Sequence, residues 1–316
     1  MKLGQFIIKR LIITIPVLFG VTVLTFLMMH AIPGDPVDYM LQQAPASEAV
    51  REELRAQYNL DEPVWMQYLL WLQDLIYLDF GESIITGRDV EGSVIARMPY
   101  TILLGSAAWL IAMVTAIPIG IYAAINKGKT ADEVSRVAAL FGVAMPNFWL
   151  GLLLLFFFSV NLGWFTVLPP TDVSLLSREM LYYLILPAVT LGTASTALLM
   201  RLMRSSMVEE LNKEYVRTAR AKGLPERTVI LKHVLRNSLI SVVTVAALMV
   251  ASIVDGSVVV EVVFAWPGMG ELIIESIQQR DFPVIQFAVV LIGISIVIAN
   301  LLADIVYAWL DPRIRY

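Results

Sequence analysis

The residues of this chain best suited to binding a charged partner lie in one polar segment, residues 201–236, between two long apolar stretches. The segment holds nine basic and four acidic residues around Gly223. A basic segment of this kind either forms a surface that meets a partner or is a solvated loop that follows the membrane charge bias. Which of the two holds decides what the protein does.

Helical spacing orders the middle of this segment. Lys213, Arg217 and Arg220 fall on one helix face, at positions i, i+4 and i+7. Gly223 is predicted to end that helix, and Pro225 suits the first turn of a second helix. The pattern predicts a short surface helix followed by a sharp turn.

Other residues with catalytic or ligand-binding chemistry are scattered. Residues 128–130 end like a phosphate-binding loop, but the glycine required five residues earlier is replaced by Ala123. The two histidines, His30 and His233, are neither paired nor part of a zinc motif, and no serine lies in a GxSxG turn. Cysteine is absent, which excludes thiolate chemistry and disulfides. We expect no enzyme, no bound metal and no cofactor in this chain.

Three acidic residues are predicted at membrane depth, where ionisable groups are costly and often functional. Asp255 and Glu261 lie toward the outer end of the fifth apolar segment, and Asp304 lies in the inner third of the sixth. A structural interpretation pairs Asp304 with Arg201 or Arg236. Gating, or a role with substrate or protons, is the alternative.

The elements that position these residues are membrane-spanning helices. The chain is 58% hydrophobic and 16% charged, with a mean hydropathy of +0.74, which is too apolar for a soluble domain of 316 residues. A spanning helix needs about 20 apolar residues. Six segments qualify, which predicts an all-α polytopic membrane protein: Leu11–Ile32, Tyr100–Ile125, Val137–Leu162, Met180–Met200, Asn237–Val260 and Pro283–Leu310.

Prolines inside these segments predict kinks, because each proline removes a helix hydrogen bond. They are Pro16, Pro118, Pro146 and Pro187.

Charge orients the spans. Residues 1–10, 126–136, 201–236 and the C-terminal tail carry 17 of the 23 basic residues, so both termini and the large loop are predicted to be cytoplasmic. The segment 33–99 is then extracytoplasmic, and its twelve acidic and four basic residues give it a local charge of −8. The net charge of −4 and the absence of a soluble basic face argue against a nucleic-acid partner.

An amphipathic helix is predicted at the outer membrane surface, over Val64–Leu78, where aromatic residues and leucines cluster. It either covers the outer ends of the spans or helps to dock a partner.

The stretch EYVRTARAKGLPERTVILKHVLRN resembles the EAA motif of the permease subunits of binding-protein-dependent ATP-binding-cassette (ABC) importers. The motif pattern E-A-A-x-x-x-G falls on Arg217, Thr218, Ala219 and Gly223. Arg217 replaces the acidic first position, and Ser241 stands where the family usually has a proline.

Further stretches are similar to the dipeptide, oligopeptide and nickel branch of that family. They include AIPGDPVDYM, MPNFWLGLLLL, EVVFAWPGMGELI and NLLADIVYAWLDPRIRY. Their order and spacing extend the resemblance over nearly the whole chain, residues 1–316, as a single transmembrane domain. The similar stretches lie at residues 31–40, 58–72, 78–84, 145–155, 261–273, 280–286 and 300–316.

The resemblance implies a complex in the plasma (inner) membrane. This chain and a second permease would form a path for di- or oligopeptides, two ATPase subunits holding ATP and Mg would lie below, and an extracytoplasmic binding protein would deliver the cargo. The implied ATPase-coupling residues are Tyr215, Arg217, Thr218, Ala219, Arg220, Gly223 and Leu224, with Ala219 facing the ATPase closely. The implied docking residues for the binding protein are Glu52, Glu53, Trp266, Gly268 and Gly270.

Two alternatives remain at this stage. A stand-alone secondary transporter or channel would need coupling-ion sites near the midplane and often an internal repeat, and neither is visible. The same class of importer also carries nickel chelates, glutathione or sugars.

Overall fold

The computed structural model of this chain is built from helices in the part it describes, which is residues 3–31, 37, 41, 47–57, 59–77, 79–171, 173–250 and 257–310. Of the side chains in these ranges, those of residues 3–11, 29, 31, 54, 57 and 304–310 are outside the description. The only β-type pairing among the described residues is an isolated bridge between Glu82 and Asp89.

The helices of the first half are α1 (Leu3–Ala31), α3 (Glu48–Gln57), α4 (Val64–Tyr77), α5 (Val90–Ile95), α6 (Met98–Ile125), α7 (Thr130–Ala144), α8 (Asn147–Leu154) and the π-helical η1 (Leu155–Asn161). Those of the second half are α9 (Arg178–Tyr183), α10 (Ile185–Leu211), α11 (Glu214–Ala221), α12 (Glu226–Thr228), the π-helical η2 (Val229–Val234), α13 (Leu235–Met249), α14 (Val258–Val263), α15 (Met269–Gln279) and α16 (Phe282–Leu310).

By length and composition, four stretches of the described residues can cross a membrane, and a bent pair of helices would make a fifth. In α1 the apolar stretch within the described side chains, Ile12–Met28, is shorter. The chain is therefore a polytopic all-α membrane protein. The four stretches are Val90–Ile125, Ile185–Leu211, Glu226–Met249 and Phe282–Ala303.

The centre of the fold is the contact between α6 and α10, which small residues make close. A Cβ on Gly192 would lie 2.8 Å from the carbonyl oxygen of Ala108, and one on Gly120 would lie 2.7 Å from the Cβ of Met203. Small residues at such positions let two helices pack closely in lipid, where van der Waals contact replaces the hydrophobic effect as the driving force.

The kink predicted at Pro146, inside the predicted span Val137–Leu162, is confirmed as a break between α7 and α8. The chain bends by 106° between α7 and α8. Pro146 causes the break, because a residue that precedes proline avoids the α conformation, and Met145 accordingly has ψ 123°. Pro16 and Pro118, in contrast, lie inside unbroken helices.

The predicted fifth span, Asn237–Val260, is displaced along the chain. Its helix begins at Glu226, because α12, η2 and α13 follow one another without a gap, and it ends at Met249. α14 is a separate short helix, and residues 251–256 between the two are outside the described ranges.

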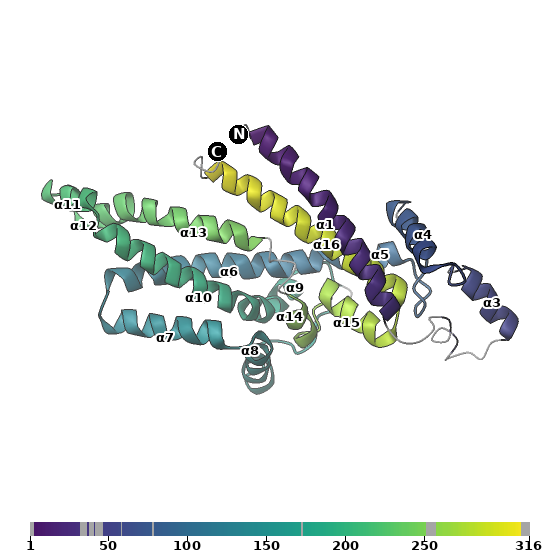
Figure 1. The fold of residues 1–316 in the computed structure, drawn as a ribbon. Helices are drawn as coiled ribbons and strands as arrows, with labels where there is room; N and C mark the ends of the chain where they lie inside the picture. The colour runs from purple at the N-terminus through teal and green to yellow at the C-terminus, as the bar shows by residue number, and fades with distance from the viewer. Residues whose placement is uncertain are drawn as a thin grey trace.

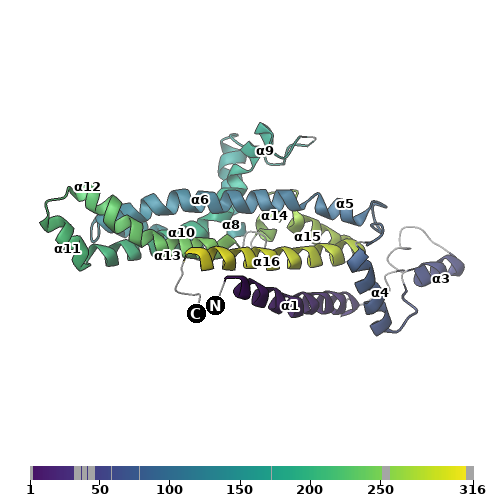
Figure 2. The ribbon, with the colours of Figure 1, turned by 90° about the horizontal axis from the view of Figure 1, so that it is seen from above.

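The two ends of the molecule differ in what they carry (Figure 1). The α11–α12 turn lies at one end, together with the connection from α6 to α7, and α3, α4 and α15 lie at the other. α1 and α16 run side by side, and the start of α1 and the end of α16 both point toward the α11 end (Figure 2).

The helix predicted over Val64–Leu78 is confirmed as α4, and its position at the membrane surface stays a prediction. It has no buried residue and contacts α1 through aromatic rings. Tyr68 hydrogen-bonds to Thr22 over 3.0 Å, and its ring lies 5.3 Å from that of Phe26. Both its length and its exposed apolar residues suit a helix at a membrane surface.

Candidate functional site

The predicted polar loop is largely helical. Residues 201–211 continue α10, and the predicted short helix is confirmed as α11. Glu214 in its first turn and Arg220 in its last turn complement the helix dipole. Its start lies only two residues after the end of α10, so α11 is closely tied to that span.

The predicted end of this helix at Gly223 is confirmed. Gly223 has φ +74°, a left-handed conformation that glycine adopts without strain. Its N–H donates to the carbonyl of Arg220 over 2.9 Å, and the N–H of Leu224 reaches the carbonyl of Ala219 over 3.4 Å. This pair of bonds is a Schellman motif, and it reverses the chain before Pro225 starts α12.

The small-residue face of α11 points into this chain, which corrects the prediction that Ala219 faces a partner. Ala219 is 7% exposed and Val216 is fully buried. Both belong to a core cluster that includes Met207 of α10 and Val234 of η2. Bulk is excluded at Ala219 by the chain's own core.

The predicted basic stripe is neutralised by neighbouring acids. Lys213 lies 2.9 Å from Glu209, and Arg217 lies 2.9 Å from Glu214. These exposed pairs contribute little stability. A partner would therefore meet a nearly neutral surface along this face.

Arg220 closes the turn through an ion pair with Glu226. Its Nε and Nη2 donate to the two carboxylate oxygens of Glu226 over 3.0 and 2.6 Å, across Gly223. The hydrogen bond to Glu226 raises the pKa of Arg220 above its usual value. Lys222 and Arg227 form no ion pair within the described part of the chain, so they supply the free positive charge here.

Tyr215 connects three helices. Its hydroxyl donates to Glu210 of α10 and accepts a hydrogen bond from Nδ2 of Asn237 in α13, over 3.0 Å. Burial, and next the hydrogen bond to Glu210, raise the pKa of Tyr215. Of the predicted coupling set only Ala219 is buried, whereas Tyr215 and Arg220 are exposed and also hydrogen-bonded within the chain, and Arg217, Thr218, Gly223 and Leu224 are exposed.

The predicted docking loop at the other end is buried, so Trp266, Gly268 and Gly270 cannot form an exposed docking surface. Trp266 is 0% exposed, its ring stacks on that of Tyr183 with a centroid separation of 6.1 Å, and its Nε1 donates to the carbonyl of Tyr100 over 3.0 Å. These contacts place the indole inside the fold.

Glu261 is the centre of that loop, and its side chain is fully buried. One carboxylate oxygen accepts from the hydroxyl of Thr101 over 2.8 Å, and the other accepts from the backbone N–H of Gly270 over 2.6 Å and of Glu271 over 3.2 Å. The N–H of Met269 donates to the same threonine hydroxyl over 2.8 Å. Glu261 therefore satisfies the free N–H groups at the start of α15 and joins them to α6.

The glycines of this loop make room for that carboxylate. A Cβ on Gly268 would lie 2.5 Å from Cδ of Glu261, and one on Gly270 would lie 2.6 Å from Cα of Val258. Beside these glycines, Nη1 of Arg97 forms an ion pair with Oε2 of Glu271 over 3.2 Å. Burial raises the pKa of Glu271 despite the opposing charge of Arg97. Of the three predicted intramembrane acids, Glu261 is thus part of a structural network.

The other two predicted acids are not tested. Asp255 lies outside the described residues, and Asp304 is in α16, where its side chain is outside the description, so its pairing with Arg201 or Arg236 stays a prediction. The predicted docking residues Glu52 and Glu53 are exposed on α3.

Two buried acids, Asp132 and Asp281, are not predicted from the sequence, and Asp132 joins two helices. Its carboxylate accepts from Nη2 of Arg204 over 2.8 Å and from the N–H of Gly128 over 2.9 Å, which ties α7 to α10. The acid follows the GKT tripeptide by two residues. The tripeptide was considered only as a phosphate loop, although its glycine N–H binds this carboxylate.

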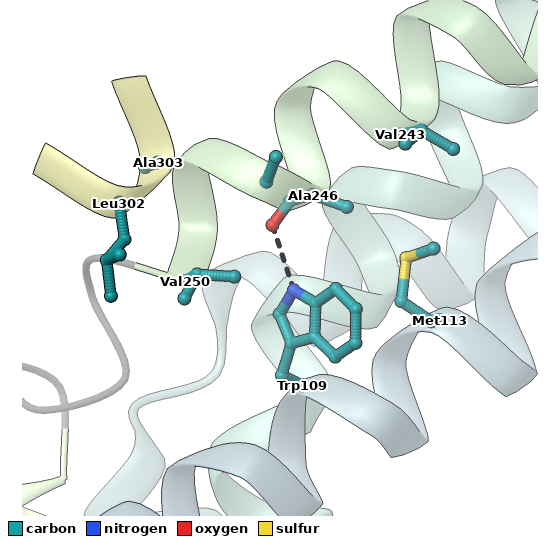
Figure 3. A pocket seen from close by; sticks show the side chains of 8 residues that line it. Trp109, Met113, Val243, Ala246, Val250, Leu302 and Ala303 are labelled. Atoms are coloured by element: carbon teal, nitrogen blue, oxygen red, sulfur yellow. Dashed lines mark hydrogen bonds between the residues drawn. The ribbon is translucent and has the colours of Figure 1, made fainter. Parts of the chain in front are cut away.

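An apolar pocket of about 250 Å³ lies between α6, α13 and α16 (Figure 3). Trp109 points into it, and its Nε1 donates to the carbonyl of Ala246 over 2.9 Å. No group of three or more His, Asp or Glu residues placed to hold a metal occurs among the described residues. The pocket is lined by Trp109, Met113, Val243, Ala246, Ala247, Val250, Leu302 and Ala303.

Comparisons with known proteins cover the whole chain. Residues 116–316 match the family described as binding-protein-dependent transport system inner membrane component, and residues 3–105 match the family for the N-terminal part of such membrane components. The oligopeptide transport system permease protein AppB of Bacillus subtilis is 43% identical over 99% of this chain and 100% of its own length.

Two further relatives are similar over their full length. The dipeptide transport system permease protein DppB of Escherichia coli K12 is 37% identical over 99% of each chain. The glutathione transport system permease protein GsiC of Escherichia coli O1:K1 is 40% identical, again over 99% of each chain.

Proposed function

We propose that the α11–α12 turn couples this chain to ATPase subunits, from the premise that the chain belongs to the family of inner membrane components of binding-protein-dependent transport systems. It is a permease subunit of a peptide ABC importer and a multi-pass protein of the plasma membrane. This membership sets aside the alternative of a stand-alone secondary transporter.

One observation carries the coupling proposal. α11 buries one face in the core shared by α10, η2 and α13, while its other face and the turn after it are exposed. A partner that binds the exposed face thus acts on two spans through packed side chains. Arg217, Thr218, Lys222 and Leu224 form the proposed contact surface, and Ala219 and Arg220 hold α11 and the turn in place.

The proposed complex contains a second permease, two ATPase subunits that bind ATP and Mg, and an extracytoplasmic binding protein. Closure of the ATPase subunits on ATP displaces α11, and α10 and α13 move with it. The path then changes from inward-open to outward-open, which is a rigid-body rearrangement of packed helices. Hydrolysis resets the ATPase subunits and the path.

The coupling surface is tested by charge and polarity changes at exposed positions. Lys222→Glu together with Leu224→Asp leaves the core untouched, so the chain still inserts. We expect co-purification of the ATPase subunits and ATP-dependent uptake into vesicles to fall about tenfold or more, as for central interface residues. Lys127→Glu makes the same lysine-to-glutamate reversal as Lys222→Glu, in the exposed α6–α7 connection, and serves as the control. Full uptake by the double variant would refute the contact.

The proposed orientation places both termini and the α11–α12 turn in the cytoplasm. Ser47 and Thr218 are exposed, and the chain has no cysteine, so single cysteines can be labelled cleanly. Ser47→Cys reacts with an impermeant thiol reagent from outside, and Thr218→Cys reacts only after the membrane is opened. The reverse labelling pattern would contradict both the orientation and the coupling role.

For docking of the binding protein, we propose the acidic helix α3, whose Glu52 and Glu53 are exposed. The buried Trp266–Gly270 loop supports the fold beside it.

The proposed cargo is a short peptide. The names of the relatives specify oligopeptides, dipeptides and glutathione, all of which contain amide bonds. Nickel chelates and sugars share no such group. Calorimetry of the partner binding protein with a tripeptide, glutathione, a nickel chelate and a disaccharide decides among the classes.

A further inference from the structure

The short helix α11 is attached to the rest of the chain by polar bonds at both of its ends. At its start, Tyr215 meets Asn237, and at its end, Arg220 meets Glu226. Both partners belong to one run of helix, because α12, η2 and α13 are continuous from Glu226 to Met249. α11 thus lies beside this run and bonds to it at two points.

The two bonded points are farther apart on the α12–α13 run than on α11. Glu226 and Asn237 are separated by about 16 Å along a helix, at 1.5 Å per residue, whereas Tyr215 and Arg220 are separated by about 7.5 Å along α11. The reach of the tyrosine and arginine side chains covers the difference. A displacement of α11 therefore acts on the α12–α13 helix at two separate positions. Such a displacement rotates the helix in addition to translating it.

The Tyr215 hydroxyl is the more informative of the two bonds. It makes the only side-chain hydrogen bond between α11 and α13 among the described residues, and the same oxygen donates its proton to Glu210 of α10. Its single oxygen accepts from Asn237 and donates to a carboxylate, so one atom joins the spans that enter and leave the turn. Hydrogen bonds to a charged acceptor are strong and directional.

We infer that Tyr215 is a positioning residue that passes the displacement of α11 on to α10 and α13 together, and that it is not itself a contact for the ATPase. This inference rests on the proposed coupling function. The apolar contacts of Val216 and Ala219 keep α11 attached without the hydroxyl, so its loss alters the transmission of movement and leaves assembly intact.

Tyr215→Phe tests this, because it keeps the ring and removes both hydrogen bonds. The complete complex is reconstituted in proteoliposomes with its binding protein, and a radiolabelled tripeptide that the binding protein retains is the transported probe. We expect the ATPase subunits to remain bound while peptide imported per ATP hydrolysed falls about three- to tenfold, the range that a lost hydrogen bond of ordinary strength produces.

Matched variants separate transmission from a general loss of structure. Tyr122→Phe removes an exposed hydroxyl from α6 that makes no hydrogen bond to the described residues, and it leaves the ratio unchanged. Asn237→Ala lowers the ratio of peptide imported to ATP hydrolysed, and the double variant with Tyr215→Phe is no worse than Tyr215→Phe alone, because Asn237→Ala removes one of the two bonds that Tyr215→Phe removes. Glu210→Gln keeps an acceptor oxygen and retains more coupling than Glu210→Ala.

Two results would overturn the inference. An unchanged ratio for Tyr215→Phe would show that the hydroxyl transmits nothing, and loss of the ATPase subunits would show that it is part of the contact surface. A failure of the proposed coupling function would be recognised by a different result. The variant with Lys222→Glu and Leu224→Asp would then keep both its ATPase subunits and its uptake.

Discussion

The α11–α12 turn lies at one end of the molecule and the α14–α15 connection lies well away from it, nearer the middle (Figure 1), and both combine acidic residues with glycines beside a short helix. At the first, Gly223 reverses the chain in open space and the charges pair on the surface. At the second, Gly268 and Gly270 enclose the buried carboxylate of Glu261. Similar residue types thus make an exposed turn in one place and an internal support in the other.

The difference shows what a charged residue beside glycine means in a membrane protein. Glu226 pairs with Arg220 across the turn, and both side chains are about half exposed. Glu261 has backbone N–H groups at a helix start and the hydroxyl of Thr101 as its partners, and it is buried. The partner, and not the residue type, decides between surface and core.

The largest expected loss of stability comes from removing the buried carboxylate of Glu261. Glu261→Ala leaves two N–H groups and the hydroxyl of Thr101 without their acceptor, which costs about 3 kcal/mol or more of stability. Thermal unfolding of the purified complex in detergent, followed by tryptophan fluorescence, measures the loss.

Glu275→Ala is the matched control on the exposed face of α15, and it changes stability by less than about 0.5 kcal/mol. Equal melting curves for the two variants would mean that the Glu261 network contributes nothing and that the comparison between the two regions fails.

The long helices and the turn after α11 can be predicted from the sequence, but the burial of the Trp266–Gly270 loop cannot. Hydropathy locates the long helices, because span length follows from membrane thickness. The glycine at the end of α11 is also predictable, since few other residues adopt its conformation. The burial of Trp266 depends on Tyr183, which lies 83 residues earlier in the chain and belongs to another helix. No local pattern reports such a contact.

The link from Tyr215 to Asn237 was missed for a second reason. η2 is π-helical, and each π turn adds a residue and rotates the following helix face by about 100° relative to an α-helix. A projection at 3.6 residues per turn therefore does not give the face on which Asn237 lies. The bend at Pro146 was predicted as a kink, but its size depends on the conformation of Met145, which the proline alone does not fix.

Glycine substitutions are expected to give the second-largest loss of stability, and the loss differs between the α14–α15 connection and the α11–α12 turn. Gly270→Ala places a Cβ against the backbone of Val258, which cannot move aside easily, so we expect a loss of about 1–3 kcal/mol. The Cβ of Gly223→Ala meets no atom within 4 Å. The variant loses about 1 kcal/mol of stability only because alanine is disfavoured in the left-handed backbone conformation, and this loss is confined mostly to the turn.

The measurement is the amount of folded complex that survives a short heat step, compared for both alanine variants and the wild type. Gly223→Ala should assemble fully. If it were the more damaging variant for assembly, the turn would be packed against something in the free chain, and the distinction between an open and an enclosed glycine would be wrong.

A smaller effect is expected from the exposed pair that closes the turn. Arg220→Gln loses its bonds to Glu226, but both side chains are about half exposed, so the stability change is about 0.2–1 kcal/mol and shrinks at high salt. The charge-swapped variant Arg220→Glu with Glu226→Arg should recover uptake that either single reversal reduces. Failure of the swap would show that Arg220 contacts the partner and not the turn.

The smallest effect concerns the outer surface of α3, to which docking is assigned now that the Trp266 loop is buried. Glu52→Lys with Glu53→Lys reverses two exposed charges and leaves the fold unchanged. Because solvent-exposed charges attract over about 10 Å at 0.1 M salt and over less at higher salt, the variant should weaken stimulation of ATP hydrolysis by the binding protein a few-fold at low salt only.

Gln57, on the same helix, is replaced by lysine as a single-charge control. Titrating the binding protein at low and high salt separates affinity from maximal rate. If stimulation by the binding protein is the same at every salt concentration, α3 is not part of the docking surface, and the outer end of this chain contributes support alone.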